Sequence, residues 1–482
     1  MLAATSSQEM STAADTEEIA ASEESRAFQI DELFFSTTDK KGLIGKANHV
    51  FMRVSAFSAD ELRNKPHNII RHPDMPRVVF KVLWEYIEDS RPIVAYVKNR
   101  AKDGRYYWVV ALVSPTAEGY LSVRFKPSSP LLSTVEGLYR HLRKIEKSIE
   151  QSGKGKPAAI AASRQELHTQ LRSLGFANYD EFMYLMFQQE LQSREAGLAS
   201  IGIGLTPRND AGKSTRGNSL HSTIHSCNRL LTSLNPVFAD LASYFSVNKQ
   251  IRSKCESVTS LSMSIRMLAL NGAIDAEKLG TLASGIGKIL DWLQSLSNGI
   301  TAECESLSTA LAKLILEVNG IIFNLGAAKL QIAMTGSFAS ELLQASSTDG
   351  GDNDRGMTDG AIEMLHASFS ETTKRALASF TAASTDLLQL RRALDRLKAS
   401  ARSLRSVYVT GKIEMANLES SQLKSIFSDL GSHLRNAEAN LQGLDEQIDT
   451  LQAQLQKTVR DAEGIDALIA DADKSLLGAA AL

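Results

Sequence analysis

The sequence predicts an α+β domain, an antiparallel sheet with flanking helices, followed by a long α-helical coiled-coil hairpin or bundle. Between residues 28 and 130, short strand patterns alternate with tight turns and short amphipathic helices. After residue 130, Ala, Leu, Ser, Gln and Glu are plentiful, a bias that favours long helices over sheets. From residue 220 onward, apolar residues recur every three or four positions, as in coiled coils.

Length and composition set broad limits on the class of protein. A chain of 482 residues is too long for one ordinary core, so we expect two or three domains. A net charge of −2 and an apolar content of 43% exclude the basic excess of a nucleic-acid binder and the composition of a wholly disordered chain. The cysteines Cys227, Cys255 and Cys304 form no CxxC pair, so we expect buried thiols in a reducing compartment.

The N-terminal residues do not resemble a signal peptide. Residues 1–27 are acidic and rich in Ser and Thr, which predicts a disordered tail. No run of about 18 consecutive apolar residues occurs in the chain, so we expect no membrane insertion. The expected location is therefore cytoplasmic.

The first domain begins with a predicted strand–turn–strand over residues 33–44. Residues 48–57 then form a short amphipathic helix, and Ser58 has the residue type and position of the N-cap of the next helix. Pro76 suits the first turn of a further helix, which carries Trp84 on its buried face. These elements precede the main part of the predicted sheet.

Three more strands complete the predicted sheet. They span residues 92–99, 105–114 and 120–126, and the turns between them contain Gly104 and Gly119. A small sheet of this kind can wrap around one buried ligand. The pattern favours a sensor domain attached to a helical transmitter.

No constellation of residues in the sequence indicates catalysis or metal binding. Ser/His/Asp orders and paired carboxylates do not rise above chance, so we expect no enzyme activity. His221 and His225 are one helical turn apart near Cys227, but a closed zinc site needs four ligands and no fourth is evident. We therefore expect a polar helix surface there and no metal.

A helical connector over residues 131–196 follows the first domain, interrupted at residues 153–157. Residues 197–219 are rich in Gly, Ser, Asn and Pro and predict a linker. Within this linker, Gly212–Ser214 resembles the end of a phosphate-binding loop. That motif requires Gly where Pro207 stands, so we expect no nucleotide site.

Residues 220–345 predict an antiparallel helical hairpin. Apolar seams run from Cys227 to Gly272 and from Leu282 to Ala328, with only a short break between them. A lone two-helix hairpin buries little surface, so we expect two such hairpins to pack as a four-helix bundle. Pro236 should kink the first arm.

The C-terminal part of the chain begins with a polar, flexible loop over residues 346–360. Residues 361–478 then form C-terminal helices with two further apolar seams, one over residues 387–404 and one over residues 441–455. These helices either extend the bundle or form a separate dimerising coiled coil.

Residues 28–130 resemble the PAS sensor domain of bacterial aerotaxis receptors. The matching segments occur in the same order and are Pro66–Pro76, Val97–Arg100, Lys102–Gly104, Tyr107–Val109 and Gly119–Arg124. In that family the PAS domain holds FAD and reports its redox state. The resemblance therefore implies FAD as a cofactor of this chain.

By this resemblance, five residues fall at positions tied to flavin binding, namely Asn48, Arg71, His72, Asp74 and Trp84. The chemistry is suitable, because an aromatic ring can pack on the flavin, Arg can meet an anion and Asn can hydrogen-bond a ring edge. The same residues also suit a structural role, with an Arg71–Asp74 salt bridge, a packed His72 and Trp84 in the core. Haem bound by His67 or His72, or a scaffold without ligand, are the alternatives.

A second resemblance concerns the predicted hairpin turn. Residues 268–280 resemble the signalling tip of methyl-accepting chemotaxis proteins, which docks a histidine kinase and its coupling protein. The contact residues that the resemblance implies are Leu268, Asn271, Asp275 and Lys278. The chain departs from the family pattern, with Asp275 for a usual Glu, Glu277 for Ala and Lys278 for Arg.

Together the two resemblances imply a redox or oxygen signal transducer, which the lack of a long apolar run predicts to be soluble. The state of a flavin in the PAS domain would pass through the helical bundle to a chemotaxis histidine kinase complex, with the chain acting as a homodimer or higher oligomer. The alternative is a PAS and coiled-coil scaffold or dimerisation protein without cofactor.

Overall fold

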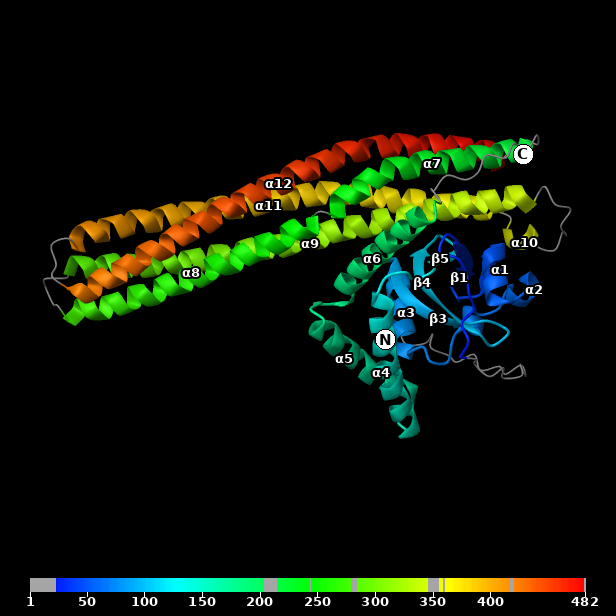
Figure 1. The fold of residues 1–482 in the computed structure, drawn as a ribbon, viewed down its shortest axis with the longest axis horizontal. Helices are drawn as coiled ribbons and strands as arrows, with labels where there is room; N and C mark the ends of the chain where they lie inside the picture. The colour runs from blue at the N-terminus through cyan, green and yellow to red at the C-terminus, as the bar shows by residue number, and fades with distance from the viewer. Residues whose placement is uncertain are drawn as a thin grey trace, which may run out of the picture. The chain divides into compact units, whose positions relative to one another are not determined.

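The structure is a computed structural model that describes residues 23–202, 215–242, 244–278, 284–345, 355–358, 360–415 and 420–480. The chain divides into two compact units (Figure 1). Unit 1 comprises Met1–Ala177, Ser193–Gly202 and Gly351–Ala361, and unit 2 comprises Asn178–Gln192, Ile203–Gly350 and Ile362–Leu482.

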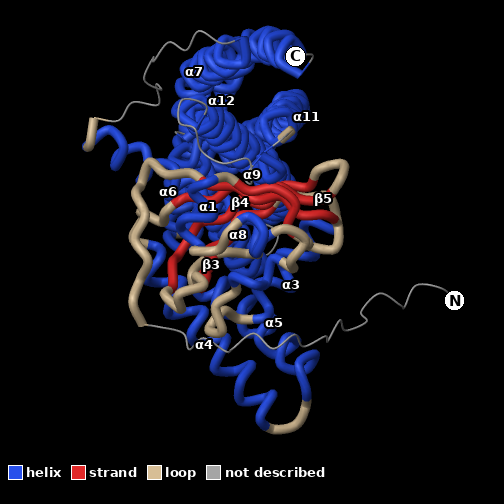
Figure 2. Tube along the Cα trace, turned by 90° about the vertical axis from the view of Figure 1, so that its right-hand side faces the viewer, coloured by secondary structure: helices blue, strands red, loops and turns tan. Residues whose placement is uncertain are grey.

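Unit 1 is built on a five-stranded antiparallel sheet (Figure 2). The strands are β1 (Phe34–Asp39), β2 (Ile44–Ala47), β3 (Ile93–Arg100), β4 (Tyr106–Pro115) and β5 (Gly119–Phe125). Their order is β2-β1-β5-β4-β3, so the first and last strands along the chain meet in the interior of the sheet. Ser36 of β1 lies opposite Ser122 of β5, and Val97 of β3 lies opposite Val109 of β4. The predicted antiparallel sheet is confirmed.

Short helices connect β2 to β3. In two of them, a side chain at the N-terminus caps the first turn and explains why the helix begins there. These helices are α1 (His49–Ser55), α2 (Ala59–Leu62), the 3₁₀ turn η1 (His67–Ile70) and α3 (Arg77–Glu88). Asn48 caps α1 by accepting a hydrogen bond from the amide of Phe51. Ser58 and Glu61 form a capping box on α2, which confirms Ser58 as the predicted N-cap.

The connector contains one more break than its sequence predicts. It consists of α4 (Leu131–Gln151), α5 (Gly155–Ser173) and α6 (Tyr179–Ser200). The predicted interruption lies between α4 and α5, where Gly153 has a φ of +80°. The unpredicted one lies between α5 and α6. There Gly175, at φ +91°, follows the end of α5, and Asn178 accepts a hydrogen bond from the amide of Glu181.

Unit 2 is a bundle of long helices. Its principal helices are α7 (Thr215–Ala242), α8 (Tyr244–Lys278), α9 (Ser284–Ala345), α11 (Ala361–Met415) and α12 (Ser421–Ala480). Helices α8 and α9 pack antiparallel, since Ser262 of α8 donates a hydrogen bond of 2.9 Å to the carbonyl of Ser297 in α9, while Gly272 lies against Leu290. The predicted helical hairpin is confirmed, and the turn at residues 279–283 lies outside the described residues.

The C-terminal helices belong to the same bundle. Helix α12 packs along α7 and α8. Lys398 of α11 pairs with Asp445 of α12 at 2.5 Å, and Lys313 of α9 pairs with Asp386 of α11 at 2.6 Å. Helices α7 and α8 both pack on α9 and on α12, so together they make one arm of the bundle. The hairpin of α7 and α8 with α9 and the hairpin of α11 with α12 therefore form one four-helix bundle within a single chain. Of the two possibilities for residues 361–478, the structure has the bundle extension.

Helix α9 is long and apolar enough, by length and composition, to cross a membrane. The segment Gly285–Ala345 has a mean hydropathy of 1.4 in its most apolar window, and 56% of that window is buried. The core helix of a soluble protein passes the same test. In unit 2, Tyr184 and Phe187 of α6 pack on Phe323 of α9, with ring centroids 5.1 and 5.5 Å apart. The absence of membrane insertion stays a prediction.

The cysteines, Pro236 and the predicted tail, linker and loop were also predicted from the sequence. The three cysteines are buried and free, as expected, and burial raises the pKa of Cys227 and of Cys255 to about 12. Pro236 lies inside α7. Of the predicted tail, linker and loop, residues 1–22, 203–214, 346–354 and 359 lie outside the described residues. Within the predicted loop, α10 (Arg355–Thr358) is helical and packs near β2 in unit 1.

Candidate functional site

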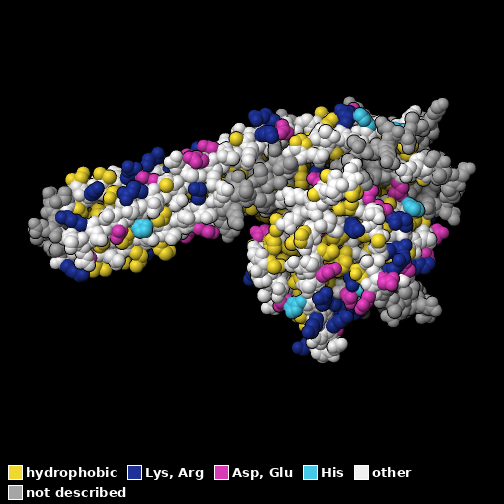
Figure 3. Space-filling view, viewed as in Figure 1, with side chains coloured by type: hydrophobic (Ala, Val, Ile, Leu, Met, Phe, Trp, Pro, Cys, Tyr) yellow, Lys and Arg dark blue, Asp and Glu magenta, His cyan; other side chains and the backbone are white. Residues whose placement is uncertain are grey.

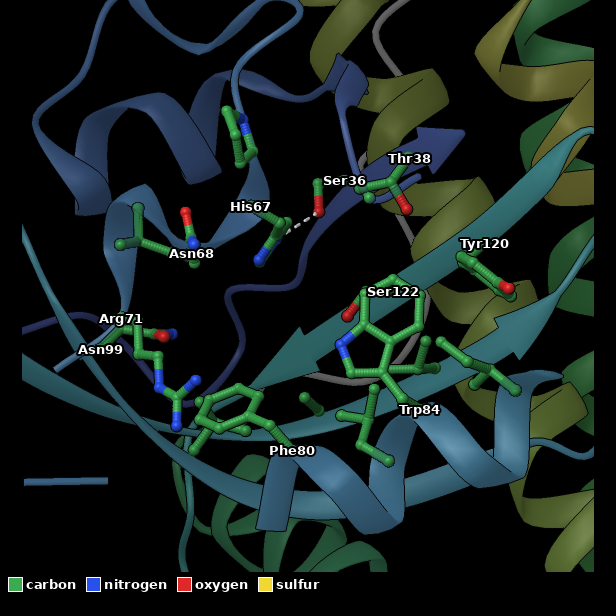
Figure 4. Close-up of a pocket in the computed structure, with 18 of the residues that line it drawn as sticks. Ser36, Thr38, His67, Asn68, Arg71, Phe80, Trp84, Asn99, Tyr120 and Ser122 are labelled. Carbon is green, nitrogen blue, oxygen red and sulfur yellow. Dashed lines mark hydrogen bonds between the residues drawn. The ribbon is translucent and has the colours of Figure 1, made fainter. Parts of the chain in front are cut away.

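A cavity of about 250 Å³ lies between α3 and the inner face of the sheet in unit 1 (Figure 4). Side chains from β1, η1, α3, β3, β4 and β5 line it, so strands and helices distant in the sequence share one wall. The apolar part of the lining consists mainly of Phe80, Leu83, Trp84, Ile87, Val97 and Val113. This composition is typical of a small-molecule site.

Trp84 forms an aromatic wall of the cavity. Its ring meets Tyr120 of β5 edge to face, with centroids 5.7 Å apart. The turn between β1 and β2 allows this position, because Gly42 has a φ of +81° and a Cβ there would lie 3.2 Å from the Trp84 ring. Trp84, one of the five residues implied by the resemblance, therefore lines the cavity.

Arg71 also lines the cavity. Its guanidinium lies over the ring of Phe80, 3.8 Å from the ring centroid. Burial, and then the positive charge of Arg77, lower the pKa of Arg71 to about 10, so the side chain remains charged at neutral pH. Figure 4 shows Arg71 close to Phe80 and Asn99.

Arg124 is a cavity residue that sequence reasoning did not single out. It lies in β5 and is buried, and both of its terminal nitrogens donate to the hydroxyl of Ser36 at 3.0 Å. Burial lowers its pKa to about 10. Desolvation, and then the charge of Arg124, hold the pKa of His67 well below its usual range, so His67 is neutral and accepts from Arg124 at 2.6 Å. Arg124 was part of the segment that matched the PAS family, and this was the only signal for it.

The charged side chains that line the cavity are all positive. Among the described residues that line it, Lys41, Arg71 and Arg124 are cations and none is Asp or Glu. The side-chain amide nitrogen of Asn99 and the hydroxyl of Ser122 are buried without a hydrogen-bond partner among the described residues. Such a buried group costs about 1–3 kcal/mol when it is left unsatisfied. The lining therefore fits a ligand with acceptor atoms or negative charge.

Asn48 does not line the cavity. Its side-chain oxygen accepts from the amides of Phe35 and Phe51 at 3.2 and 3.3 Å, and its side-chain nitrogen donates to the carbonyl of Leu33 at 3.2 Å. These bonds tie β1 to the start of α1. The structure thus places Asn48 in a structural position, and its role toward a cofactor stays a prediction.

His72 and Asp74 lie on a different surface from Arg71. The ring of His72 is buried and its Nδ1 accepts from the amide of Asp74 at 3.2 Å. Asp74 is exposed and pairs, among the described residues, with Lys98 at 3.4 Å and Lys147 at 3.9 Å rather than with Arg71. Both residues border an open groove, over which Lys and Arg side chains of α4 gather (Figure 3).

The cavity fits a flavin better than haem. Its volume lies just below the usual range for ligand sites, so it suits one ring system, and the rest of a dinucleotide would extend through its opening. The unsatisfied donors of Asn99 and Ser122 suit the carbonyl and nitrogen acceptors of a flavin edge. For haem, Nε2 of His67 is already hydrogen-bonded to Arg124, and His72 lies outside the cavity lining.

The four residues implied as kinase contacts lie in the last turns of α8. The ammonium of Lys278 is 2.7 Å from the carboxylate of Asp275. Leu268 is half-buried at a groove between α8 and α12, and Asn271 is exposed. The same end of α8 carries exposed apolar side chains at Met263, Met267, Leu270 and Ile274.

Comparison with known proteins agrees with this geometry. Residues 46–120 match the family model described as the PAS fold, so unit 1 contains a PAS domain. Over 117 residues the chain is 38% identical to the aerotaxis receptor of Escherichia coli (strain K12). This match spans 23% of this chain and 23% of the receptor. The resemblance to an aerotaxis-type PAS sensor is confirmed, and it indicates a signal transducer.

A solved structure also shows similarity, the blue-light activated histidine kinase of Erythrobacter litoralis EL346. The identity is 10%, and the superposition covers 37% of this chain and 59% of that chain with a TM-score of 0.20. A score at this level carries no argument about fold or function.

Proposed function

We propose that this chain is a non-enzymatic redox sensor that binds FAD in the PAS cavity and reports its state to a chemotaxis histidine kinase complex. The observation that carries the proposal is the lining of the cavity. It combines apolar and aromatic walls with three cations, of which Arg124 is buried, with unsatisfied donors, and with no carboxylate among the described residues. The similarity of unit 1 to the aerotaxis receptor supports the same ligand class.

The chain's own residues have distinct tasks at this site. Phe80 and Trp84 supply apolar contact for a planar ring, while Asn99 and Ser122 offer hydrogen bonds to its polar edge. A bound flavin supplies reversible electron transfer. Because Lys41, Arg71 and Arg124 line the cavity, they favour the form of the ligand that carries more negative charge.

The bundle is the proposed route from the sensor to a kinase. Two antiparallel hairpins in one chain make a stiff element with interdigitated seams, which can shift between discrete packings. By resemblance, the end of α8 with Leu268, Asn271, Asp275 and Lys278 contacts the kinase and coupling protein. The proposed protein is cytoplasmic and works as a homodimer or higher oligomer.

Optical spectra of the purified full chain test the cofactor. We expect a yellow protein whose flavin absorption bleaches on chemical reduction and returns in air. A red protein would indicate haem. A colourless protein that does not take up added FAD would contradict the proposal and favour the scaffold alternative.

Capture of a kinase–coupling-protein pair tests the signalling end. Reversing charge at Asp275 or Lys278 alone also breaks their mutual ion pair, so the informative variant is the swap Asp275→Lys with Lys278→Asp, which restores it. We expect the swap to abolish capture while the helix content is unchanged. Equal capture by the swapped and wild-type chains would remove the tip assignment.

A further inference from the structure

A buried carboxylate from α4 caps the start of α3. Glu146 is fully buried, and its two carboxylate oxygens accept from the backbone amides of Arg77 at 2.8 Å and Val78 at 3.0 Å. Ser163 of α5 donates to the same carboxylate at 2.9 Å, and Arg143 of α4 does so at 3.3 Å. One side chain thus joins three helices of unit 1.

The sequence near α3 explains why a distant cap is needed. The N-cap residue is Pro76, which has no side-chain acceptor, so the first amides of the helix have no local partner. A carboxylate is well suited to replace that partner, because the N-terminus of a helix carries a partial positive charge. Removal of Glu146 would therefore leave buried donors unsatisfied as well as removing an ion pair.

Helix α3 has two functional sides. One side presents Phe80, Leu83 and Trp84 to the cavity. The other side is held to the α4–α5 hairpin by two ion pairs in addition to the cap, Arg77 with Glu150 at 2.7 Å and Glu85 with Arg164 at 2.5 Å. Any displacement of α3 by a ligand therefore acts directly on α4 and α5.

We infer that α3 transmits the state of the cavity to the α4–α5 hairpin and that Glu146 is the positioning residue of this joint. The inference rests on the proposed sensor function. When the ligand changes, α3 shifts against the hairpin, and the bidentate cap changes strength. The hairpin is the first part of the connector after the PAS domain, so its stability is the regulated output of unit 1.

Hydrogen–deuterium exchange of the full chain with oxidised and reduced flavin measures this coupling. In the wild type, we expect reduction to change exchange in residues 131–173. Glu146→Gln keeps the size of the side chain but loses its charge and one acceptor, so the amides of Arg77 and Val78 should exchange about tenfold faster. The flavin spectrum should be unchanged, and the redox response of α4 and α5 should disappear.

The matched control is Glu150→Gln, which weakens two partly exposed side-chain ion pairs, with Arg77 at 2.7 Å and Arg143 at 3.7 Å, and leaves the Glu146 carboxylate in place. It should leave exchange at Arg77 and Val78 within about twofold of the wild type, and it should keep the redox response. Ser163→Ala gives a milder perturbation of the same cap if Glu146→Gln folds poorly. A redox response that persists in Glu146→Gln, or that is absent from flavin-loaded wild type, overturns the inference.

A second arm does not depend on flavin. Trp84→Ala disturbs the cavity side of α3, and its effect on exchange in α4 and α5 is compared with and without Glu146→Gln as a double-mutant cycle. An effect of Trp84→Ala that vanishes without the cap supports the inference. An equal effect in both backgrounds, or none in either, overturns it. If the chain binds no flavin, the proposed function is rejected. The double-mutant cycle alone then tests whether Glu146 couples α3 to α4 and α5.

Discussion

In the wall of the cavity, the guanidinium of Arg124 lies 2.6 Å from Nε2 of His67. Arg124 is buried and His67 is half-buried, and the imidazole is neutral because desolvation and the neighbouring cation lower its pKa. Among the residues that the structure describes, Arg124 therefore keeps its charge with neutral hydrogen-bond partners alone, Ser36 and His67. A buried cation in such surroundings is costly for folding and is explained most directly by a ligand.

Replacement of Arg124 by Met should therefore have opposite effects on stability and on binding. We expect the flavin-free chain to be at least as stable as the wild type, because an uncompensated buried charge is removed. FAD affinity should fall by about tenfold or more, since a charged hydrogen bond contributes about 1.5–3 kcal/mol. Thermal unfolding and flavin-fluorescence titration provide the two readouts.

Lys126 offers the control for this experiment. It follows β5 and donates to the carbonyl of Phe28, but it is not among the residues lining the cavity. Lys126→Met should leave FAD affinity within about twofold of the wild type, since its ammonium bonds to Phe28, which does not line the cavity. Equal loss of affinity in both variants would show that general positive charge, and not the position of Arg124, is responsible.

The stability of unit 1 should fall as the pH is lowered from about 6.5 to about 4. Desolvation and the charge of Lys98 lower the pKa of His72 to about 4, so the unfolded state binds a proton in this range before the folded state does. His72 thus favours folding above its unfolded-state pKa, and this contribution is lost as the pH falls toward the folded-state value. His67, also with a lowered pKa, acts in the same direction.

His72→Gln tests this pH dependence. Its slope of unfolding free energy against pH should be smaller than that of the wild type by up to about 1.4 kcal/mol per pH unit. Urea unfolding followed by the fluorescence of Trp84 and Trp108 measures this free energy. The chain carries Trp292→Phe, so that unit 2 contributes no tryptophan fluorescence. Identical slopes for His72→Gln and its parent would contradict the assignment.

Alanine substitutions at Gly42 and Gly153 distinguish the effect of backbone strain from the effect of cavity shape. They have φ values of +81° and +80°, but a Cβ at Gly42 would press on Trp84, whereas one at Gly153 would meet nothing within 4 Å. Alanine at either position should cost about 1–2 kcal/mol from backbone strain. Only Gly42→Ala should also shift the fluorescence of Trp84 and weaken flavin binding. A shift of similar size in Gly153→Ala would argue against a cavity effect.

Two glycines of the bundle should respond to alanine with opposite signs. A Cβ at Gly411 of α11 would overlap the ring of Phe427 and lie 2.9 Å from Ile289, so Gly411→Ala should destabilise the bundle by about 1–3 kcal/mol. A Cβ at Gly299 of α9 would meet nothing within 4 Å, and Gly299→Ala should stabilise it by about 0.5–1 kcal/mol. Unfolding followed by far-UV circular dichroism distinguishes them. Equal changes of one sign would contradict the described packing.

Local patterns were sufficient to predict most elements of the fold. Alternation and turn residues predicted the strands, and Ser58 as an N-cap and the apolar seams predicted helices close to those observed. The break at Gly175 was missed, because one glycine within a long helical pattern is weak evidence against continuity. Whether the C-terminal seams joined the bundle depended on contacts such as Lys398 with Asp445, which periodicity cannot specify.

The site was less predictable, since it depends on pairing between distant strands. Of the five residues that the family resemblance implied, Arg71 and Trp84 line the cavity, and their contact with a cofactor stays a prediction. Arg124 reaches the cavity only because β5 pairs with β1 in a particular register. Asn48 illustrates the opposite case, since an Asn at the start of a helix is as well suited to capping as to ligand binding, and the structure uses it as a cap.

Flavin content of the full chain, measured in the wild type and in Ala111→Trp, tests the central claim most directly. Ala111 of β4 is buried and lines the cavity, so a bulky side chain there should fill the space. After incubation with excess FAD and removal of free flavin, the account predicts about one FAD per wild-type chain and almost none in folded Ala111→Trp. Absence of FAD from the wild type, or equal retention by the variant, would contradict binding in this cavity.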